Sequence, residues 1–104
     1  MIRGVLIPPD APAYVVNVTP TLEMFQYLVG GDIESIPLLG GEHAFGYINA
    51  EGKMLMLPPN PMATHHASLF LGDYIAGPML VLGGVDKNGN ETEVSDDLIA
   101  RLVS

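Results

Sequence analysis

The sequence predicts an α+β fold, in which a mostly antiparallel sheet is packed with two main helices and a short C-terminal helix. At 104 residues the chain has the size of one domain, so residues 1–104 should share a single core. Apolar residues make up 48% of the chain and are spread throughout, which is typical of a folded globule. Strand-like runs and helical patterns alternate too irregularly for repeated βαβ units, which favours an antiparallel sheet.

The first two strand-like runs predict a hairpin. Residues 1–7 end in a Val-Leu-Ile run, and Pro8 and Pro9 close this strand. The segment from Tyr14 to Val18 is β-branched and aromatic, as a second strand should be.

The next segment predicts a helix over about Pro20 to Val29. Thr19 before Pro20 has the residue type of a helix cap, and Gly30 and Gly31 should stop the helix. The apolar side chains expected to form its buried face are Leu22, Phe25, Leu28 and Val29.

Two more strands should follow this helix. Asp32 to Leu39 should lie at a sheet edge or bend at Pro37, because proline lacks the amide that a central strand needs. Gly40 and Gly41 supply the next turn, and His43 to Asn49 is the second strand.

The strand from His43 to Asn49 has an aromatic face formed by Phe45 and Tyr47. Gly46 on the other face weakens the packing or admits a neighbouring backbone. His43 is interpreted as a strand-end residue.

The chain should then turn at Asn49, Glu51 and Gly52, which have the chemistry of turn residues. The apolar run from Lys53 to Leu57 either pairs back as a short hairpin strand or forms an extended loop.

Prolines at positions 58, 59 and 61 make the next loop stiff and end any strand there. Asn60 directly before Pro61 combines a capping side chain with proline at the first helical position, so a helix should begin at Pro61. The Asn60 side chain should accept the amide hydrogen of Met62 or Ala63. On capping alone, Asn60→Ala costs about 1 kcal/mol, whereas Ser or Asp should replace Asn60 at much lower cost.

This helix is predicted to run from Pro61 to Leu71 and to end at Gly72. On a helical wheel its core-facing side carries Met62, His66, Leu69 and Phe70. His66 should therefore be a core or interface residue, whereas Thr64 and Ser68 should face solvent.

The C-terminal third predicts a kinked strand and a short helix. The apolar run from Tyr74 to Leu82 is broken by Gly77 and Pro78, so Met79 to Leu82 should be its buried half. After a loop over residues 83–90, a short strand can form at residues 92–94. Finally, Ser95 should cap a helix with an acidic first turn whose inward side chains are Leu98, Ile99 and Leu102.

Composition and charge exclude several classes of protein. The net charge of −8 argues against direct binding of nucleic acid, which needs basic residues. The absence of cysteine suits a reducing cytosol. Residues 1–7 are too short for a signal peptide, and no apolar run reaches the roughly 20 residues of a membrane span. We expect a soluble cytoplasmic protein with no membrane partner, and homo-oligomerisation stays open.

The sequence contains no convincing catalytic or metal-binding pattern. His65 and His66 diverge by about 100° on a helix, unlike the i, i+4 pairs of zinc enzymes. No glycine pair is followed by the Lys-Ser or Lys-Thr of a phosphate loop, and no Ser, His and Asp set has a nucleophile context. We therefore expect no enzyme activity, no cofactor and no metal.

Three segments together resemble a known family. VGGDIE (29–34), NAEGKMLMLPPNPMAT (49–64) and GDYIAGPMLVLG (72–83) are similar to domain of unknown function 3846, a family of short proteins from actinobacteria, other bacteria and especially their phages. The resemblance implies an α+β fold and a phage or mobile-element context, but it implies no reaction.

Three binding functions follow. The first is a small non-enzymatic phage or mobile-element accessory protein that binds a host or phage protein, with the stiff loop at 58–61 and, if they are exposed rather than buried, Met54 and Met56 as contacts. The second is an acidic decoy of a nucleic-acid-binding protein, which needs carboxylates spaced like phosphates. The third is a small-molecule pocket between the sheet and helix 61–71, lined by Tyr47, Asn60 and His66.

The candidate binding residues are therefore few. Lys53, Asn60 and Thr64 would present polar groups to a ligand in the proline loop, although Asn60 is more simply a helix cap. Tyr47 and His66 belong to the pocket hypothesis. A further acidic cluster is interpreted as a solvated surface and consists of Asp86, Glu91, Glu93, Asp96 and Asp97.

Overall fold

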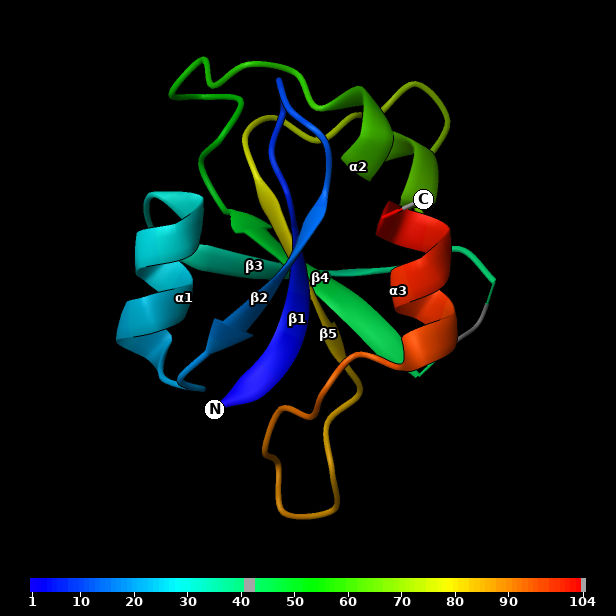
Figure 1. Ribbon diagram of the computed structural model, residues 1–104. Helices are drawn as coiled ribbons and strands as arrows, with labels where there is room; N and C mark the ends of the chain where they lie inside the picture. The colour runs from blue at the N-terminus through cyan, green and yellow to red at the C-terminus, as the bar shows by residue number, and fades with distance from the viewer. Residues whose placement is uncertain (41–42, 104) are drawn as a thin grey trace.

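The computed structural model describes residues 1–40 and 43–103. Along the chain its elements are β1 (Ile2–Ile7), β2 (Tyr14–Val18), α1 (Leu22–Val29), β3 (Ile33–Pro37), β4 (Ala44–Asn49), α2 (Pro61–His66), β5 (Met79–Gly83) and α3 (Asp96–Val103). The strands form one sheet in the order β2-β1-β5-β4-β3, and every neighbouring pair is antiparallel (Figure 1). The predicted α+β fold is confirmed, as is the predicted β1–β2 hairpin.

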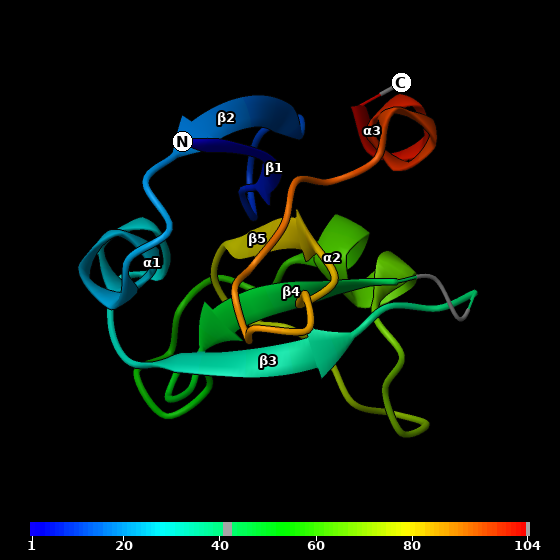
Figure 2. The same cartoon turned by 90° about the horizontal axis from the view of Figure 1, so that it is seen from below.

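The helices cover both faces of the sheet. Helix α1 packs on one face, whereas α2 and α3 lie on the other (Figures 1 and 2). Strand β5 lies at the centre, with Leu80 and Leu82 on the α1 face and Met79 and Val81 on the opposite face, all 0% exposed. A strand covered on both faces needs an apolar residue at each position, which explains the unbroken apolar run predicted to be buried here.

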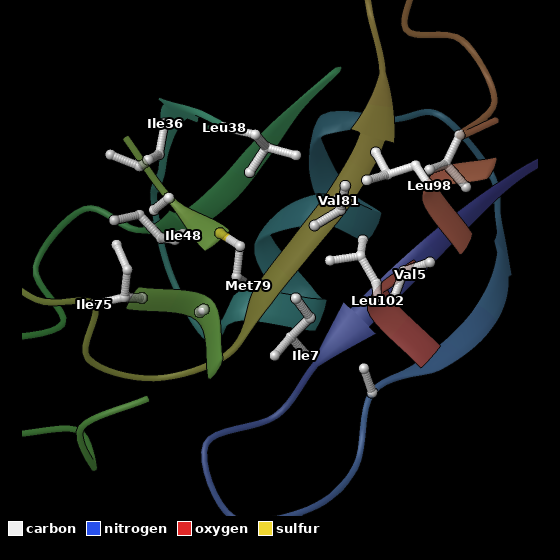
Figure 3. Packing of buried hydrophobic residues seen from close by; sticks show 14 residues of the cluster. Val5, Ile7, Ile36, Leu38, Ile48, Ile75, Met79, Val81, Leu98 and Leu102 are labelled. Carbon is white, nitrogen blue, oxygen red and sulfur yellow. The ribbon is translucent and has the colours of Figure 1, made fainter. Parts of the chain in front are cut away.

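The larger apolar cluster joins the sheet to α2 and α3 (Figure 3). Gly46 of β4 faces this cluster, and a Cβ at position 46 would lie only 2.5 Å from the sulfur of Met79. Gly46 therefore makes room for a neighbouring side chain, not for a neighbouring backbone.

Helix α1 begins two residues later than predicted. Thr21 is its cap, because Thr21 Oγ1 accepts the amide hydrogen of Met24 at 3.2 Å. Thr19, the predicted cap, instead accepts the Thr21 amide hydrogen in a tight turn that contains Pro20. Gly30 ends the helix with φ 83°, as predicted, because glycine adopts this left-handed conformation without strain.

Strand β3 lies at the sheet edge, as Pro37 predicted, and Pro37 is its last residue. His43 immediately precedes β4 and is exposed, which agrees with a strand-end residue. Of the predicted glycine turn, Gly41 lies outside the described residues.

The segment from Lys53 to Leu57 forms neither a hairpin strand nor an extended loop. It folds into consecutive turns, in which the Leu55 amide donates to Glu51 O at 2.8 Å and the Leu57 amide to Gly52 O at 2.9 Å. Local hydrogen bonds thus replace the ladder that a strand would need.

Helix α2 ends at His66, five residues earlier than predicted, and its buried face differs from the prediction. Ala63 and Ala67 are buried, whereas Met62 is 40% and Phe70 is 91% exposed. The helix stops because Ala67 has extended backbone angles and pairs with Leu38 beside β3. The wheel placed the largest apolar residues inward, but the small alanines are the side chains that let α2 approach the sheet closely.

At the C-terminal end, Ser95 caps α3 as predicted, since Ser95 Oγ accepts the Leu98 amide hydrogen at 3.2 Å. Leu98 and Leu102 are buried and Ile99 is half-buried. Residues 92–94 form no strand, although the Val94 amide donates to Arg3 O at 3.1 Å. Within residues 1–40 and 43–103, no helix is long and apolar enough to cross a membrane.

Asn60 connects three parts of the fold. Its Oδ1 accepts the Ala63 amide hydrogen at 3.0 Å, which confirms the predicted cap. Its Nδ2 donates to Ile7 O at the end of β1 and to Gly77 O before β5, each at 2.9 Å. Asn60 is 1% exposed, so none of these bonds can be replaced by water without rearrangement.

We predict that Asn60→Ala lowers the free energy of unfolding by roughly 2–4 kcal/mol, because it removes the cap and takes a side-chain donor away from two buried carbonyls. Asn60→Asp should be similarly destabilising, since a carboxylate would face the carbonyl oxygens of Ile7 and Gly77. Asn60→Ser should also be costly, because the short hydroxyl cannot span all three partners. These two results would differ from the mild effects that capping alone predicts.

Urea unfolding measures these changes. Asn88→Ala is the matched control, because Asn88 is exposed and bonds to Asp86 Oδ1 through its backbone amide, which alanine keeps. The stability of this variant should change by no more than about 0.5 kcal/mol. An Asn60→Asp variant as stable as the wild type would show that the Nδ2 bonds contribute little.

Candidate functional site

The structure does not bring Tyr47, Asn60 and His66 together. Tyr47 lies on the α1 face, with ring centroids 5.0 Å from Phe25 and 4.8 Å from Phe45. Asn60 caps α2 and His66 is the last residue of this helix, which lies on the opposite side of the sheet. The predicted pocket lined by these three residues is therefore wrong, because side chains that seem compatible in sequence face opposite sides of the sheet.

Tyr47 has a structural partner. Its hydroxyl donates to Glu91 Oε2 at 2.8 Å and links β4 to the segment after β5. Burial, followed by the hydrogen bond and the negative charge of Glu91, raises the pKa of Tyr47 to about 12. The phenol thus ties β4 to residue 91, and Tyr47 also borders a hollow on the α1 face of the sheet.

Thr64 also serves the fold. Thr64 was predicted to face solvent but is half-buried, whereas Ser68 is exposed as predicted. Thr64 Oγ1 donates to Asn60 O at 2.7 Å. The same oxygen accepts the Ile75 amide hydrogen at 2.9 Å. Asn60 and Thr64 thus hold the proline loop in place from within.

His66 is half-buried instead of lying in the core. It borders a hollow at the α2–α3 boundary together with Leu102 and Arg101. Burial lowers the pKa of His66, and the charges of His65 and Arg101 lower it further. Among the described residues, no three His, Cys, Asp or Glu side chains gather as a metal site would require; that no histidine binds metal stays a prediction.

Four of the five carboxylates in the acidic cluster have partners within the fold, and all five but Glu91 are exposed, as expected of a solvated surface. Arg3 pairs with Glu93 at 3.6 Å and with Asp96 at 3.1 Å, and Glu91 accepts from Tyr47. Asp86 Oδ1 accepts the amide hydrogens of Asn88 and Asn90 in its own turn. These carboxylates have different tasks and do not form an array of free charges.

Lys53, another predicted site residue, lines a cleft beside β3. The cleft has a volume of about 300 Å³ and lies between β3, β4 and two loops, at residues 50–57 and 68–74. The Lys53 ammonium pairs with Asp73 and lies 4.8 Å from the centre of the Tyr74 ring. The hydrogen bond to Asp73 raises the pKa of Lys53, and the same bond lowers the pKa of Asp73.

A second hollow of about 460 Å³ continues this cleft along β3. The two hollows share Glu34, Ile36, Leu69 and Asp73, and we call the combined feature the β3 groove. Met54 lies at one end and Phe70 at the other. The groove therefore has an apolar floor and an acidic rim in which Lys53 provides a positive charge.

The loop at residues 51–57, called the methionine loop below, presents large apolar side chains to solvent. Met54 is 78% and Met56 is 87% exposed, so the alternative that these methionines are buried is wrong. Leu55 between them is 56% exposed.

The methionine loop is nevertheless firmly attached. Gly52 is buried, and a Cβ at its position would lie 2.4 Å from the carbonyl oxygen of Ala76. Leu57 lies against Gly77, and Met56 has a left-handed φ of 57°. A non-glycine residue holds this conformation only where its surroundings impose it, so the shape of the loop is built in.

The sequence interpretation misplaced Phe70, which lines the β3 groove, and its neighbour Leu71. Phe70 and Leu71 were assigned to helix 61–71, but they lie in the following loop and are 91% and 107% exposed. Gly72, which has φ 88°, was the available signal for a turn at this position.

We predict that Gly52→Ala disrupts the methionine loop, because the added methyl group must displace the Ala76 carbonyl. The free energy of unfolding should fall by roughly 1–3 kcal/mol, and tryptic cleavage after Lys53 should become faster. Gly89→Ala is an informative comparison, since nothing lies within 4 Å of its Cβ position and only its φ of 85° is unfavourable; it should leave cleavage after Lys53 unchanged. Unaltered cleavage in Gly52→Ala would contradict the tight attachment of the loop.

We also predict a late tyrosine ionisation. An unfolded tyrosine ionises near pH 10, whereas the pKa of Tyr47 is about 12 in the folded protein. The stabilisation linked to protonated Tyr47 is therefore complete below about pH 10 and is lost as the pH rises toward 12. In a phenolate absorbance titration, Tyr47→Phe should remove the latest phase, and Glu91→Gln should move this phase to lower pH. If neither variant alters the latest phase, the assignment to Tyr47 is incorrect.

A profile of the family described as Domain of unknown function (DUF3846) matches residues 2–104. No curated protein and no solved structure gives a significant match. The matched region spans essentially the whole chain and includes the proline loop, the methionine loop and β5. The chain therefore belongs to the DUF3846 family.

Proposed function

We propose that this is a small non-enzymatic protein that acts by binding another protein through its methionine loop. The observation that carries the proposal is the exposure of Met54 and Met56 on a loop whose backbone is fixed by Gly52 and Leu57. A contiguous exposed apolar surface on a folded domain commonly marks a contact site.

The chemistry of the loop suits recognition of a protein. Methionine side chains are unbranched and polarizable, so they adapt to the shape of a partner. Since the backbone is already ordered, binding would freeze only side chains, which lowers the entropic cost of association. Leu55 between the two methionines extends the apolar contact.

The family resemblance in the proline loop supports a partner from the host or from a phage, met in the host cytoplasm. The decoy alternative has less support, because Glu91, Glu93 and Asp96 already contact Tyr47 or Arg3. The small-molecule alternative loses its three-residue pocket because Tyr47 lies on the other face of the sheet, although Asn60 and His66 still border one hollow of about 640 Å³.

The proposal is tested by placing a photo-crosslinking amino acid at position 56 and illuminating the protein in a host lysate, with and without phage infection. The matched control carries the same group at position 27, because Tyr27 is 80% exposed on α1, away from the loop. We expect a discrete protein adduct from position 56 that is absent from position 27.

Competition sharpens the result. Excess unlabelled wild type should suppress the adduct, whereas an excess of the double variant Met54→Asp and Met56→Asp should not. Both side chains are exposed, so the stability of the double variant should change by no more than about 1 kcal/mol. Adducts that are identical from positions 56 and 27, or suppressed equally by both competitors, would refute binding through the methionine loop.

A further inference from the structure

Strand β3 has an open edge whose hydrogen-bonding groups can be assigned. Within a strand, the amide and carbonyl of one residue point to the same side and those of the next residue to the other. Asp32 O accepts from Ala50 beside β4, whereas Pro37 O and the Leu39 amide bond to Ser68 and His66 on the far side. The regular β3–β4 register therefore directs the backbone groups of Ile33 and Ser35 away from the sheet.

No described segment pairs with these groups. The segment from His66 to Ser68 bonds to Leu39 and Pro37 at the end of this edge. After Ser68 the chain turns away through residues 70–73. Figure 2 shows β3 at the rim of the sheet, with the loop at 50–57 in green and the loop at 68–74 in yellow-green beyond it. The open edge is thus short. It lies on the same outer side of β3 to which residues 66–68 are already bonded.

Hollows flank this edge on both faces of the sheet. On the α2 face lies the β3 groove, into which Glu34 and Ile36 point. On the α1 face lies a hollow of about 480 Å³ bordered by Ile33, Phe45 and Val85. Successive side chains of an added strand point to opposite faces, so each would meet one of these hollows.

We propose that β3 binds an extended segment of a partner protein by strand addition, with a Lys or Arg of that segment opposite Glu34 and apolar residues on either side of it. This inference rests on the proposed function, because it specifies how a protein partner engages the chain. Main-chain bonds to Ile33 and Ser35 would supply the pairing, and the hollows would supply the selectivity.

Charge identifies the central residue of the segment. In an antiparallel pairing, Glu34 would occupy a non-hydrogen-bonded position, because its own backbone groups bond toward β4. Side chains at such positions approach one another most closely. A basic side chain there would meet the Glu34 carboxylate at the rim of the groove, beside the Lys53–Asp73 pair, whose opposite charges offset one another.

The same geometry disfavours a second copy of this chain as the occupant. Pairing two β3 strands about Glu34 sets Glu34 against Glu34, and pairing about Ile33 sets Glu34 against Asp32; like charges opposite one another are destabilising. Pairing about Ser35 requires Pro37 of the other copy, which has no amide and whose carbonyl already accepts from Ser68.

The experiment selects binders from a display library of short random peptides, using the full chain as bait. We expect enriched peptides with an apolar–basic–apolar alternation. Ser35→Pro removes the outward amide without touching the β3–β4 ladder, which an edge strand tolerates. It should weaken binding of the enriched peptide about tenfold, as expected for one lost hydrogen bond. Ser35→Ala keeps the amide and should bind within about twofold of wild type, whereas Glu34→Lys should abolish the preference for basic peptides.

Amide hydrogen exchange on the wild type provides a readout that does not depend on whether Ser35→Pro folds: the peptide should slow exchange at Ile33 and Ser35. The inference is overturned by failure to enrich peptides, by equal binding to Ser35→Pro and Ser35→Ala, or by unchanged exchange at both amides. Concentration-dependent dimerisation lost in Ser35→Pro would assign the edge to a second copy instead.

The outcomes separate the two proposals. A partner that crosslinks from position 56 but is captured equally by Ser35→Pro would refute strand addition alone. Peptide binding that depends on Ser35, without any specific adduct from position 56, would refute the methionine loop alone.

Discussion

The three hydrogen bonds of the Asn60 side chain are the constraint on which the rest of the structure depends. They join the end of β1, the start of α2 and the backbone before β5. These three segments are far apart in the sequence but adjacent in the structure. Because the side chain is buried, every donor and acceptor must be satisfied inside the protein. The Asn60 amide group therefore fixes the bend at Gly77 and the position of α2 together with the backbone bonds from Gly77 N to Pro58 O and from Asn60 N to Ile75 O.

These buried hydrogen bonds explain how the methionine loop keeps one backbone conformation while it exposes large apolar side chains. Thr64 extends the Asn60 network to Ile75, and the neighbouring Ala76 packs on Gly52 of the methionine loop. The loop is thus tied to the same framework that positions β5. Backbone hydrogen bonds hold the loop in its shape, so the loop stays ordered although its methionines face solvent. The β3 groove lies directly beside Met54.

The candidate site was only partly predictable. Lys53 was recognised as a polar residue of the central loop, and it does line the cleft. Tyr47, Asn60 and Thr64 were recognised as polar residues in an apolar chain, but their partners lie 44, 53 and 11 positions away in sequence, and these partners give them structural tasks. Glu34 and Ser35 gave no signal of their own, although Pro37 suggested an edge, because the backbone groups that stay unpaired are known only from the β3–β4 register.

The sequence by itself determined the approximate positions of the five strands of the sheet, the caps at Asn60 and Ser95, and the end of α1 at Gly30. For the strand containing Pro37 it narrowed the choice to an edge or a bend. Each of these depends on local backbone chemistry, which few neighbouring residues specify. Tertiary structure decided the buried face of α2, the turns of the methionine loop and the side of the sheet that Tyr47 occupies. Those features depend on which distant segment lies opposite: Ala63 and Ala67 turn inward because the sheet leaves space only for small side chains, and α2 stops where Ala67 pairs with Leu38.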